Sequence, residues 1–154
     1  MKTHELHHTQ LIKKSLPDVF SFFENPANLA KITPPELGFK ILTPTPIQMG
    51  KGSLIDYTVC VMRFPIRWTS LISEYEPPHK FVDVQLKGPY SFWHHTHLFE
   101  EHPEGTLIKD IVHYCLPFGL VGNLLHGLFV KRQLHGIFAY REKVISDFFE
   151  KEYR

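Results

Sequence analysis

The sequence has little of several features that would assign a protein to a class at once. It has only two cysteines in 154 residues, Cys60 and Cys115, and they form no CxxC pair. The cysteine content therefore does not indicate a disulfide scaffold, and we expect both cysteines to be thiols in a reducing cytoplasm. The N-terminal stretch MKTHELHHTQ lacks the apolar core of a signal peptide, which also favours a cytoplasmic location.

An excess of charge and a long apolar run are missing as well. Seventeen Lys and Arg face sixteen Asp and Glu, for a net charge of +1. Nucleic-acid binders usually carry a basic excess or stripe, so we expect no nucleic-acid partner. The longest apolar run, residues 116–130, is broken by Pro117, Asn123 and His126. It is also shorter than the ~20 residues of a spanning helix, so we expect no stable membrane insertion.

The sequence does contain enough apolar residues for a hydrophobic core, and it shows a clear order of secondary-structure elements. Hydrophobic residues make up 43% of the chain and include 13 Phe, enough for one domain over residues 1–154. Loose alternation predicts a first strand over 4–13. Ser15 can cap the short helix that follows, and a second short helix is expected at about 26–32.

The middle of the chain changes to a strand pattern, and the end changes to a helical one. After Pro117, apolar residues recur at helical spacing, which predicts one long helix from about 121 to 151. A sheet must bury one face and an amphipathic helix one stripe. We therefore expect an α+β protein in which a curved seven-stranded antiparallel sheet wraps around the C-terminal helix and leaves a cavity. Segments that alternate in polarity between Gly and Pro breakers give the other six strands: 38–43, 52–62, 66–75, 80–87, 90–101 and 105–115.

Five stretches carry a resemblance to a known family. They are LPDVFSFFENPANLAKITPP (16–35), GSLIDYTV (52–59), FPIRWTSLI (64–72), EPPHKFVDVQLKGPYSFWHHTHLFEE (76–101) and the GT…D…Y.LP pattern of 105–117. Over residues 3–150 the chain resembles the START-like, birch-pollen-allergen-like helix-grip superfamily (SRPBCC). In local sequence it is most similar to the bacterial polyketide cyclase/dehydrase-like group of that superfamily.

The resemblance implies a helix-grip fold with two short helices after the first strand, and it implies no cofactor. Superfamily members bind lipids, quinones, polyketides and plant hormones, and some catalyse cyclisation or dehydration. The leading expectation is therefore binding, with carriage or sensing, of a small hydrophobic or amphipathic ligand in the cavity. The alternatives are a cyclase/dehydrase-type enzyme and a protein-interaction module without a ligand.

The stretch HPEG at 102–105 fixes the register of the last hairpin. It has Pro at its second position and Gly at its fourth, as a type I turn prefers. If the turn pairs Glu101 with Thr106, the pairs further along are Phe99–Ile108, His97–Asp110, His95–Val112 and Trp93–Tyr114.

Alternation along this strand divides its histidines between two faces. Trp93, His95, His97 and Phe99 share the more aromatic face, which we expect to point inward, and His94 points outward. His97 and Asp110 can then be a satisfied polar pair in the core. Alternatively, His95 and His97 present polar groups to a ligand with Asp110 behind them. Acid–base work by either histidine is the catalytic version of the second interpretation.

A metal site is the least favoured interpretation of this strand. His-x-His places two imidazoles on one face, a spacing that zinc enzymes use. A third ligand would have to be Asp110, Asp56 or Asp83, and no HExxH motif supports the site. We therefore expect no metal, and we expect the N-terminal histidines, among them His4 and His8, to face solvent.

Other polar and aromatic residues within the strand patterns are candidates to bind the ligand. Asp56 or Asp83 can pair with Arg67, and such a pair is either a plain ion pair or a group that orients the polar head of a ligand. The tryptophans are core or cavity wall, and the tyrosines donate hydrogen bonds to a ligand carbonyl or to the backbone. The candidates besides the inward residues of the hairpin are Asp56, Tyr57, Arg67, Trp68, Asp83 and Tyr114.

The apolar segment 119–130 has two possible fates. It packs against the sheet, or it forms an exposed apolar surface for a partner or a membrane. Gly127 and Gly136 fall inside the expected helix, where each costs about 1 kcal/mol relative to Ala. Close approach of the helix to the sheet, room for a ligand, or a local kink would each explain why the helix tolerates these glycines. The second half of the helix places Arg141 and other charged residues on its outer face.

Overall fold

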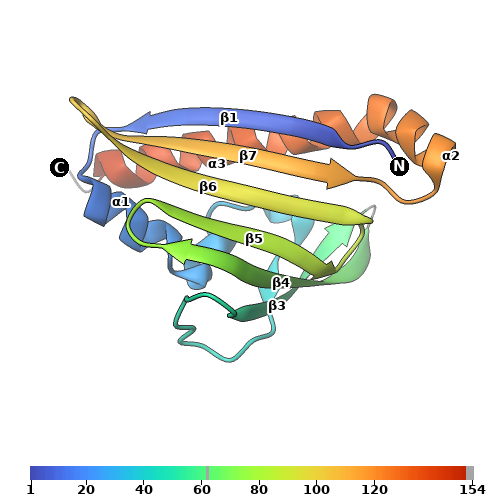
Figure 1. Ribbon diagram of the computed structural model, residues 1–154, viewed down its shortest axis with the longest axis horizontal. Helices are drawn as coiled ribbons and strands as arrows, with labels where there is room; N and C mark the ends of the chain where they lie inside the picture. The colour runs from blue at the N-terminus through green and yellow to red at the C-terminus, as the bar shows by residue number, and fades with distance from the viewer. Residues whose placement is uncertain (62, 152–154) are drawn as a thin grey trace.

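The computed structural model of the protein describes residues 1–61 and 63–151 (Figure 1). Seven strands form one antiparallel sheet in the order β1-β7-β6-β5-β4-β3-β2. The strands are β1 (His4–Ile12), β2 (Lys40–Ile41), β3 (Leu54–Val61), β4 (Phe64–Glu76), β5 (Lys80–Lys87), β6 (Phe92–His102) and β7 (Gly105–Cys115).

The helices lie in two groups along the chain. The first follows β1 and contains α1 (Leu16–Phe23) and two 3-10 segments, Pro26–Ala30 and Pro35–Leu37. The second contains α2 (Gly119–Leu125), a π-helical turn (His126–Val130) and α3 (Lys131–Lys151). The sheet curves, and α3 runs behind β1 and β7 (Figure 1). This is the predicted helix-grip architecture.

Local chemistry explains where the first helices begin. The Ser15 hydroxyl accepts a hydrogen bond from the Asp18 backbone N–H at 3.4 Å and donates one to the Asp18 carboxylate at 2.6 Å. The first interaction satisfies a backbone N–H that the first turn of a helix leaves open, and the second holds the two side chains together. Asn25 caps the next segment in the same way, since its side-chain oxygen accepts from the Ala27 N–H at 3.1 Å.

The predicted register of the last hairpin is confirmed. Trp93 pairs with Tyr114, His95 with Val112, His97 with Asp110 and Phe99 with Ile108. All four residues of β6 in these pairs are buried, and the residues between them are not. The predicted inward face of the strand is therefore confirmed as well.

Some element boundaries differ from the expectation. The strand expected over 38–43 has only two residues, because the chain leaves the sheet toward Pro44 and Pro46. The long helix begins at Gly119 and contains the π turn. A Cβ added at Gly127 or Gly136 would meet nothing within 4 Å, so close approach to the sheet does not explain these glycines. Met62, the expected last residue of a strand, and the final three residues of the chain lie outside the described residues.

The core consists of two apolar clusters on the inner face of the sheet. One gathers Phe20, Phe99 and Phe149, and the other gathers Trp93, Leu134 and Phe138 with their neighbours. His97 stacks on Phe81 of the first cluster with ring centroids 4.1 Å apart. The His95 ring lies 5.8 Å from that of Phe138 in the second. The two histidines therefore lie where the clusters meet.

Candidate functional site

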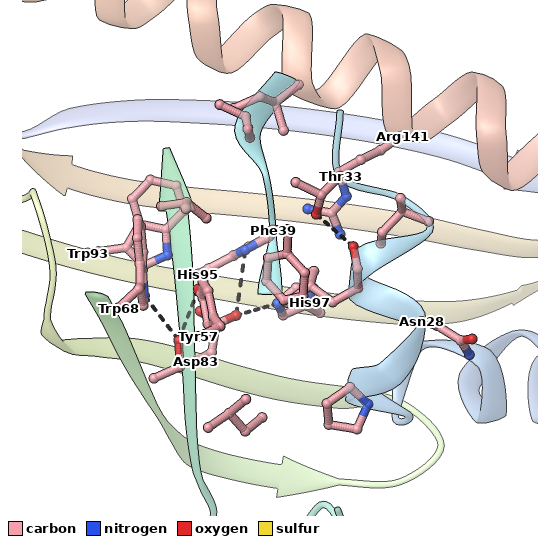
Figure 2. Close-up of a pocket in the computed structure, with 18 of the residues that line it drawn as sticks. Asn28, Thr33, Phe39, Tyr57, Trp68, Asp83, Trp93, His95, His97 and Arg141 are labelled. Atoms are coloured by element: carbon pink, nitrogen blue, oxygen red, sulfur yellow. Dashed lines mark hydrogen bonds and ion pairs between the residues drawn. The ribbon is translucent and has the colours of Figure 1, made fainter. Parts of the chain in front are cut away.

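A cavity of about 210 Å³ lies between the sheet, the segments after α1, and α3 (Figure 2). Its wall is mainly apolar and aromatic, with contributions from Phe23, Ile32 and Leu134. Pockets for small molecules typically combine such walls with a few converging polar groups. Of the candidates chosen from sequence, the cavity is lined by Tyr57, Trp68, Asp83, Trp93, His95 and His97.

One end of the wall is aromatic with satisfied polar atoms. Trp68 donates its indole N–H to the Ser70 hydroxyl at 3.1 Å, and the Tyr57 hydroxyl lies 3.5 Å from the same oxygen. The Tyr57 and Trp68 rings stack with centroids 5.8 Å apart. Burial, helped by the negative charge of Asp83, raises the pKa of Tyr57, which therefore stays neutral. These side chains offer the cavity flat apolar surface.

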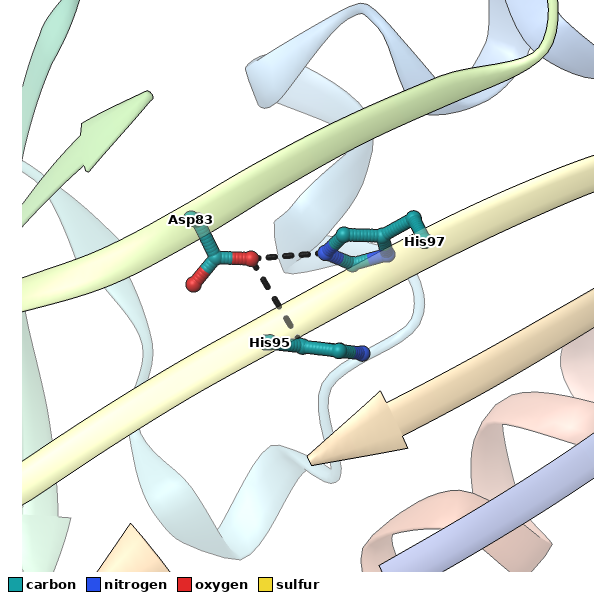
Figure 3. A group of neighbouring side chains, drawn as sticks. All are labelled: Asp83, His95 and His97. Carbon is teal, nitrogen blue, oxygen red and sulfur yellow. Dashed lines mark hydrogen bonds and ion pairs between the residues drawn. The ribbon is translucent and has the colours of Figure 1, made fainter. Parts of the chain in front are cut away.

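The other polar feature is a closed arrangement of two imidazoles and two carboxylates. Asp83 Oδ2 lies 2.6 Å from His97 Nε2 and 3.6 Å from His95 Nδ1 (Figures 2 and 3). On the far side, Asp110 Oδ1 lies 2.7 Å from His95 Nε2 and 3.3 Å from His97 Nδ1. The imidazole ring centroids are 3.7 Å apart. Each histidine is thus held between both aspartates.

Strand register brings these side chains together. His95 pairs with Asp83 of β5, and His97 pairs with Asp110 of β7. Asp110 pairs in turn with His8 of β1. Directly paired residues share a face of the sheet, so the four strands β5, β6, β7 and β1 contribute one continuous polar group on the inner face.

Burial and mutual contact give the two histidines opposite properties. Burial would lower the pKa of His97, but hydrogen bonding to Asp110 and Asp83 outweighs it and raises that pKa. Burial, reinforced by the nearby charge of His97, lowers the pKa of His95. The group therefore favours a cationic His97 beside a neutral His95.

Both carboxylates are kept ionised by the same contacts. Burial alone would raise the pKa of Asp110, but contacts with His8, His95 and His97 hold it well below its usual range. For Asp83, burial likewise acts upward, and the hydrogen bond from His97 together with the charges of His95, His97 and Arg141 outweighs it, so its pKa is lowered. Two carboxylates are then balanced by one imidazolium and by the positive charge of Arg141, which acts on Asp83.

Proton placement leaves a lone pair on one nitrogen of His95. A neutral His95 that donates from Nε2 to Asp110 carries its lone pair on Nδ1, 3.6 Å from Asp83 Oδ2. Among the buried side-chain nitrogen and oxygen atoms of residues 1–61 and 63–151, His97 Nδ1 is the one without a hydrogen-bond partner. A group that can donate a hydrogen bond would find two acceptors here, His95 Nδ1 and the carboxylate of Asp83.

The structure corrects three assignments of residues to the outer surface. His4 is half-buried, and its ring stacks on that of His126 with centroids 3.5 Å apart. His8 is half-buried, with Nδ1 3.9 Å from Asp110 and Nε2 2.9 Å from Glu142. Arg141, expected on the outer face of the helix, lines the cavity and lies 5.1 Å from the Phe138 ring (Figure 2). The periodicity missed Arg141 because a long side chain at the edge of the apolar stripe can reach inward.

Two candidates lie on the other side of the sheet. Arg67 and Asp56 form an ion pair at 2.6 Å, and the Arg67 side chain is 54% exposed. Because Trp68 and Ser70 point inward, the alternation of β4 turns Arg67 outward. The interpretation of this pair as part of the ligand site is therefore replaced by that of a plain surface ion pair.

Phe99 and Tyr114 point inward, but they belong to the core around the cavity. Phe99 packs with Phe20 and Phe23, with ring centroids 5.2 and 5.3 Å away. The Tyr114 hydroxyl is 2.7 Å from Nε2 of His126, beyond the end of β7. Tyr114 therefore connects the sheet to the helical segment that follows it.

The donor atoms of Asp83, His95 and His97 all lie within 4.8 Å of one another, so they are the group that could hold a metal ion. The third ligand would be Asp83, one of the three aspartates considered from sequence. The two imidazoles, however, lie with their centroids 3.7 Å apart and their planes tilted by 31°, so their nitrogens sit side by side next to Asp83 (Figure 3). A shared ion would require the rings to splay apart. The present geometry fits hydrogen bonding better than chelation.

Comparison with known proteins shows the fold. A scan against protein-family models finds no match, and a search of curated proteins finds none either. Among solved structures, the Zhui aromatase/cyclase from Streptomyces sp. R1128 superposes with a TM-score of 0.76 at 14% identity, over 99% of this chain and 97% of that one. The protein has the helix-grip fold.

Two further structures agree. A point mutant of norcoclaurine synthase from Thalictrum flavum, in complex with a transition-state analogue, gives a TM-score of 0.71 at 16% identity, covering 99% of this chain and 98% of that one. Ara h 8.0201 gives 0.62 at 15% identity, covering 94% and 99%. The helix-grip fold expected from the sequence is thus confirmed.

Proposed function

We propose that the protein binds a small, mainly apolar molecule that carries a hydroxyl group. The observation that carries this proposal is the cavity itself: apolar walls surround a few polar groups, among which Asp83, His95 and His97 lie together. The walls favour a flat ring system, and the remaining acceptor capacity of His95 Nδ1 and of the Asp83 carboxylate favours a donor such as a phenol. Solved structures with this fold include enzymes that are named for acting on small molecules.

The two tryptophans of the chain, Trp68 and Trp93, both line the cavity, so they report on binding without a label. We expect 1-naphthol to change tryptophan emission at about tenfold lower concentration than naphthalene, because only the phenol donates to the polar group. Fluorescence titration of the whole protein tests this.

Two variants make the test specific. Asp83→Asn should remove the preference for the phenol and leave naphthalene binding in place. Leu134→Trp should fill the cavity and abolish binding of both, with circular dichroism to verify the fold. Equal affinity of the two probes in the wild-type protein contradicts the hydroxyl preference. Undiminished binding to Leu134→Trp contradicts the cavity as the site.

A second candidate function is acid–base catalysis, as in a cyclase or dehydrase. It is favoured by the opposite protonation of His95 and His97, since a base and an acid side by side are what proton transfer requires. We expect the protein to accelerate exchange of the protons next to the carbonyl of 2-tetralone in D₂O, followed by NMR. His95→Gln should abolish the acceleration and still bind the ketone. If the wild-type protein binds the ketone without accelerating proton exchange, the result contradicts the catalytic function and is consistent with a carrier.

A further inference from the structure

Residues 118–130, which we call the lip, expose an unusual number of large apolar side chains. Figure 1 shows α2, which forms much of the lip, at the end of the molecule next to the N-terminus. The exposed side chains are Phe118, Leu120, Val121, Leu124, Leu125, Leu128 and Phe129.

The polarity of the lip is inverted relative to an ordinary surface helix. The exposed residues recur four positions apart, as in Leu120, Leu124 and Leu128, and so form one continuous outward face. As far as His126, the residues turned toward the protein are small or polar, and only Val130, at the end of the lip, packs against the core. Gly122 is buried, and Asn123 and His126 are half-buried.

Specific contacts hold the lip in this orientation. The Tyr114 hydroxyl is 2.7 Å from His126, and the ring of His126 stacks on that of His4 at 3.5 Å. A Cβ on Gly122 would lie 2.0 Å from the carbonyl oxygen of Pro117, so the helix approaches the preceding chain as closely as glycine allows. The apolar face points to solvent because its polar back is bonded to the sheet.

The charged residues that adjoin the lip along the chain are basic. Lys131 and Arg132 follow it directly, and both are exposed. No Asp or Glu occurs between Asp110 and Glu142. Lys2 also lies near, since its charge and that of Lys131 help to lower the pKa of His126, after burial and His4. The apolar face therefore has a basic rim.

From this combination we infer that the lip docks on the surface of a lipid bilayer that contains anionic lipids. Apolar side chains enter the interface and basic residues meet the headgroups, as in monotopic amphipathic helices. A second copy of the chain is a poorer occupant, because it would bring two basic rims together. No helix within residues 1–61 and 63–151 is long and apolar enough to span a membrane, so the contact is interfacial.

Docking would also bring the cavity close to the bilayer. Gln133 and Leu134 line the cavity, and they lie within about one helical turn of Phe129. An apolar molecule could then pass between bilayer and cavity over a short distance. The docking proposal does not depend on that passage, and vesicle binding alone tests it.

The test is co-sedimentation of the whole protein with vesicles. We expect binding to phosphatidylcholine vesicles that contain about one quarter phosphatidylserine, and much weaker binding to phosphatidylcholine alone. Leu124→Ser with Phe129→Ser should reduce binding by at least about tenfold. Lys131→Gln and Arg132→Gln should each reduce it about fivefold and weaken its dependence on salt.

Matched variants elsewhere serve as controls. Phe64→Ser removes an equally exposed phenylalanine, and Lys143→Gln removes an exposed lysine on α3. Neither should change binding. Failure to bind any anionic vesicle overturns the proposal, and so does equal loss in Phe64→Ser. Self-association in analytical ultracentrifugation that Leu124→Ser abolishes, without vesicle binding, would assign the face to a second copy instead.

Discussion

Leu134 and Leu128 belong to one continuous helical segment, yet Leu134 is 3% exposed and Leu128 is 59% exposed. In α3, apolar residues such as Phe138 and Ile145 face the sheet, and the charged residues other than Arg141 face solvent. In the lip this order is reversed. The difference teaches that helical periodicity identifies a face but does not say what covers it. In α3 the sheet covers it, and in the lip no described part of the chain does.

The largest expected effect sharpens this comparison directly. Leu134→Ala should lower the free energy of unfolding by about 2–5 kcal/mol, because it removes buried side-chain atoms and leaves a void. Leu128→Ala should change it by less than about 0.5 kcal/mol. Urea denaturation of the two variants measures the difference. Similar losses in both would mean that the outward face of the lip is packed in solution.

A smaller effect is expected where the lip is attached. Tyr114→Phe removes the hydroxyl bonded to His126 and should cost about 1 kcal/mol. Amide hydrogen exchange should then quicken in the lip, and it should stay unchanged in the second half of α3. Faster exchange along all of α3 would contradict the division of the helical segment into two parts.

A substitution inside the lip should stabilise the protein. A Cβ at Gly127 meets nothing, so Gly127→Ala should raise the free energy of unfolding by up to about 1 kcal/mol through helix propensity. Gly122→Ala is the matched opposite, because its Cβ would collide with Pro117. Thermal denaturation distinguishes them. A stabilising Gly122→Ala would show that the lip does not hold this close contact.

His97 and His126 should give the stability of the protein opposite dependences on pH. Contacts with Asp110 and Asp83 raise the pKa of His97 above 6.5, so its contribution to stability is present below that pH and is lost as pH rises through the folded-state value. Burial lowers the pKa of His126, so stability is lost as pH falls below 6.5.

Unfolding free energies from about pH 5 to about pH 9 test this. His97→Gln should remove part of the decline on the alkaline side, and His126→Gln part of the decline on the acid side. A decline that both variants alter on the same side would contradict the opposite assignments.

The hairpin of β6 and β7 could be predicted in full, because a short turn fixes register and alternation fixes the face. These two rules place His95, His97 and Asp110 together from the sequence alone. Asp83 could be named as a candidate but not placed beside the histidines, since the connection between β5 and β6 has no turn signal as specific as HPEG. His8 comes from the far end of the chain, and no local pattern links it to Asp110.

The remaining errors have physical causes that are just as specific. Arg67 could have been placed outward, because Trp68 beside it takes the inward position. For the lip, the sequence allows two outcomes, because its apolar residues occupy so much of the helix that periodicity alone does not select the buried side. The bonds of His126 to Tyr114 and His4, which select it, join residues far apart in sequence.

The basic rim of the lip has a consequence for the solubility of the protein in concentrated solution. At low ionic strength, Lys2, Lys131 and Arg132 repel the same residues on other molecules and keep the apolar faces apart. Salt at about 1 M shortens the reach of that repulsion to ~3 Å, while sulfate and phosphate also strengthen apolar association. Concentrated solutions should therefore stay clear in dilute buffer and turn cloudy on addition of ammonium sulfate, at a concentration that Leu124→Ser raises.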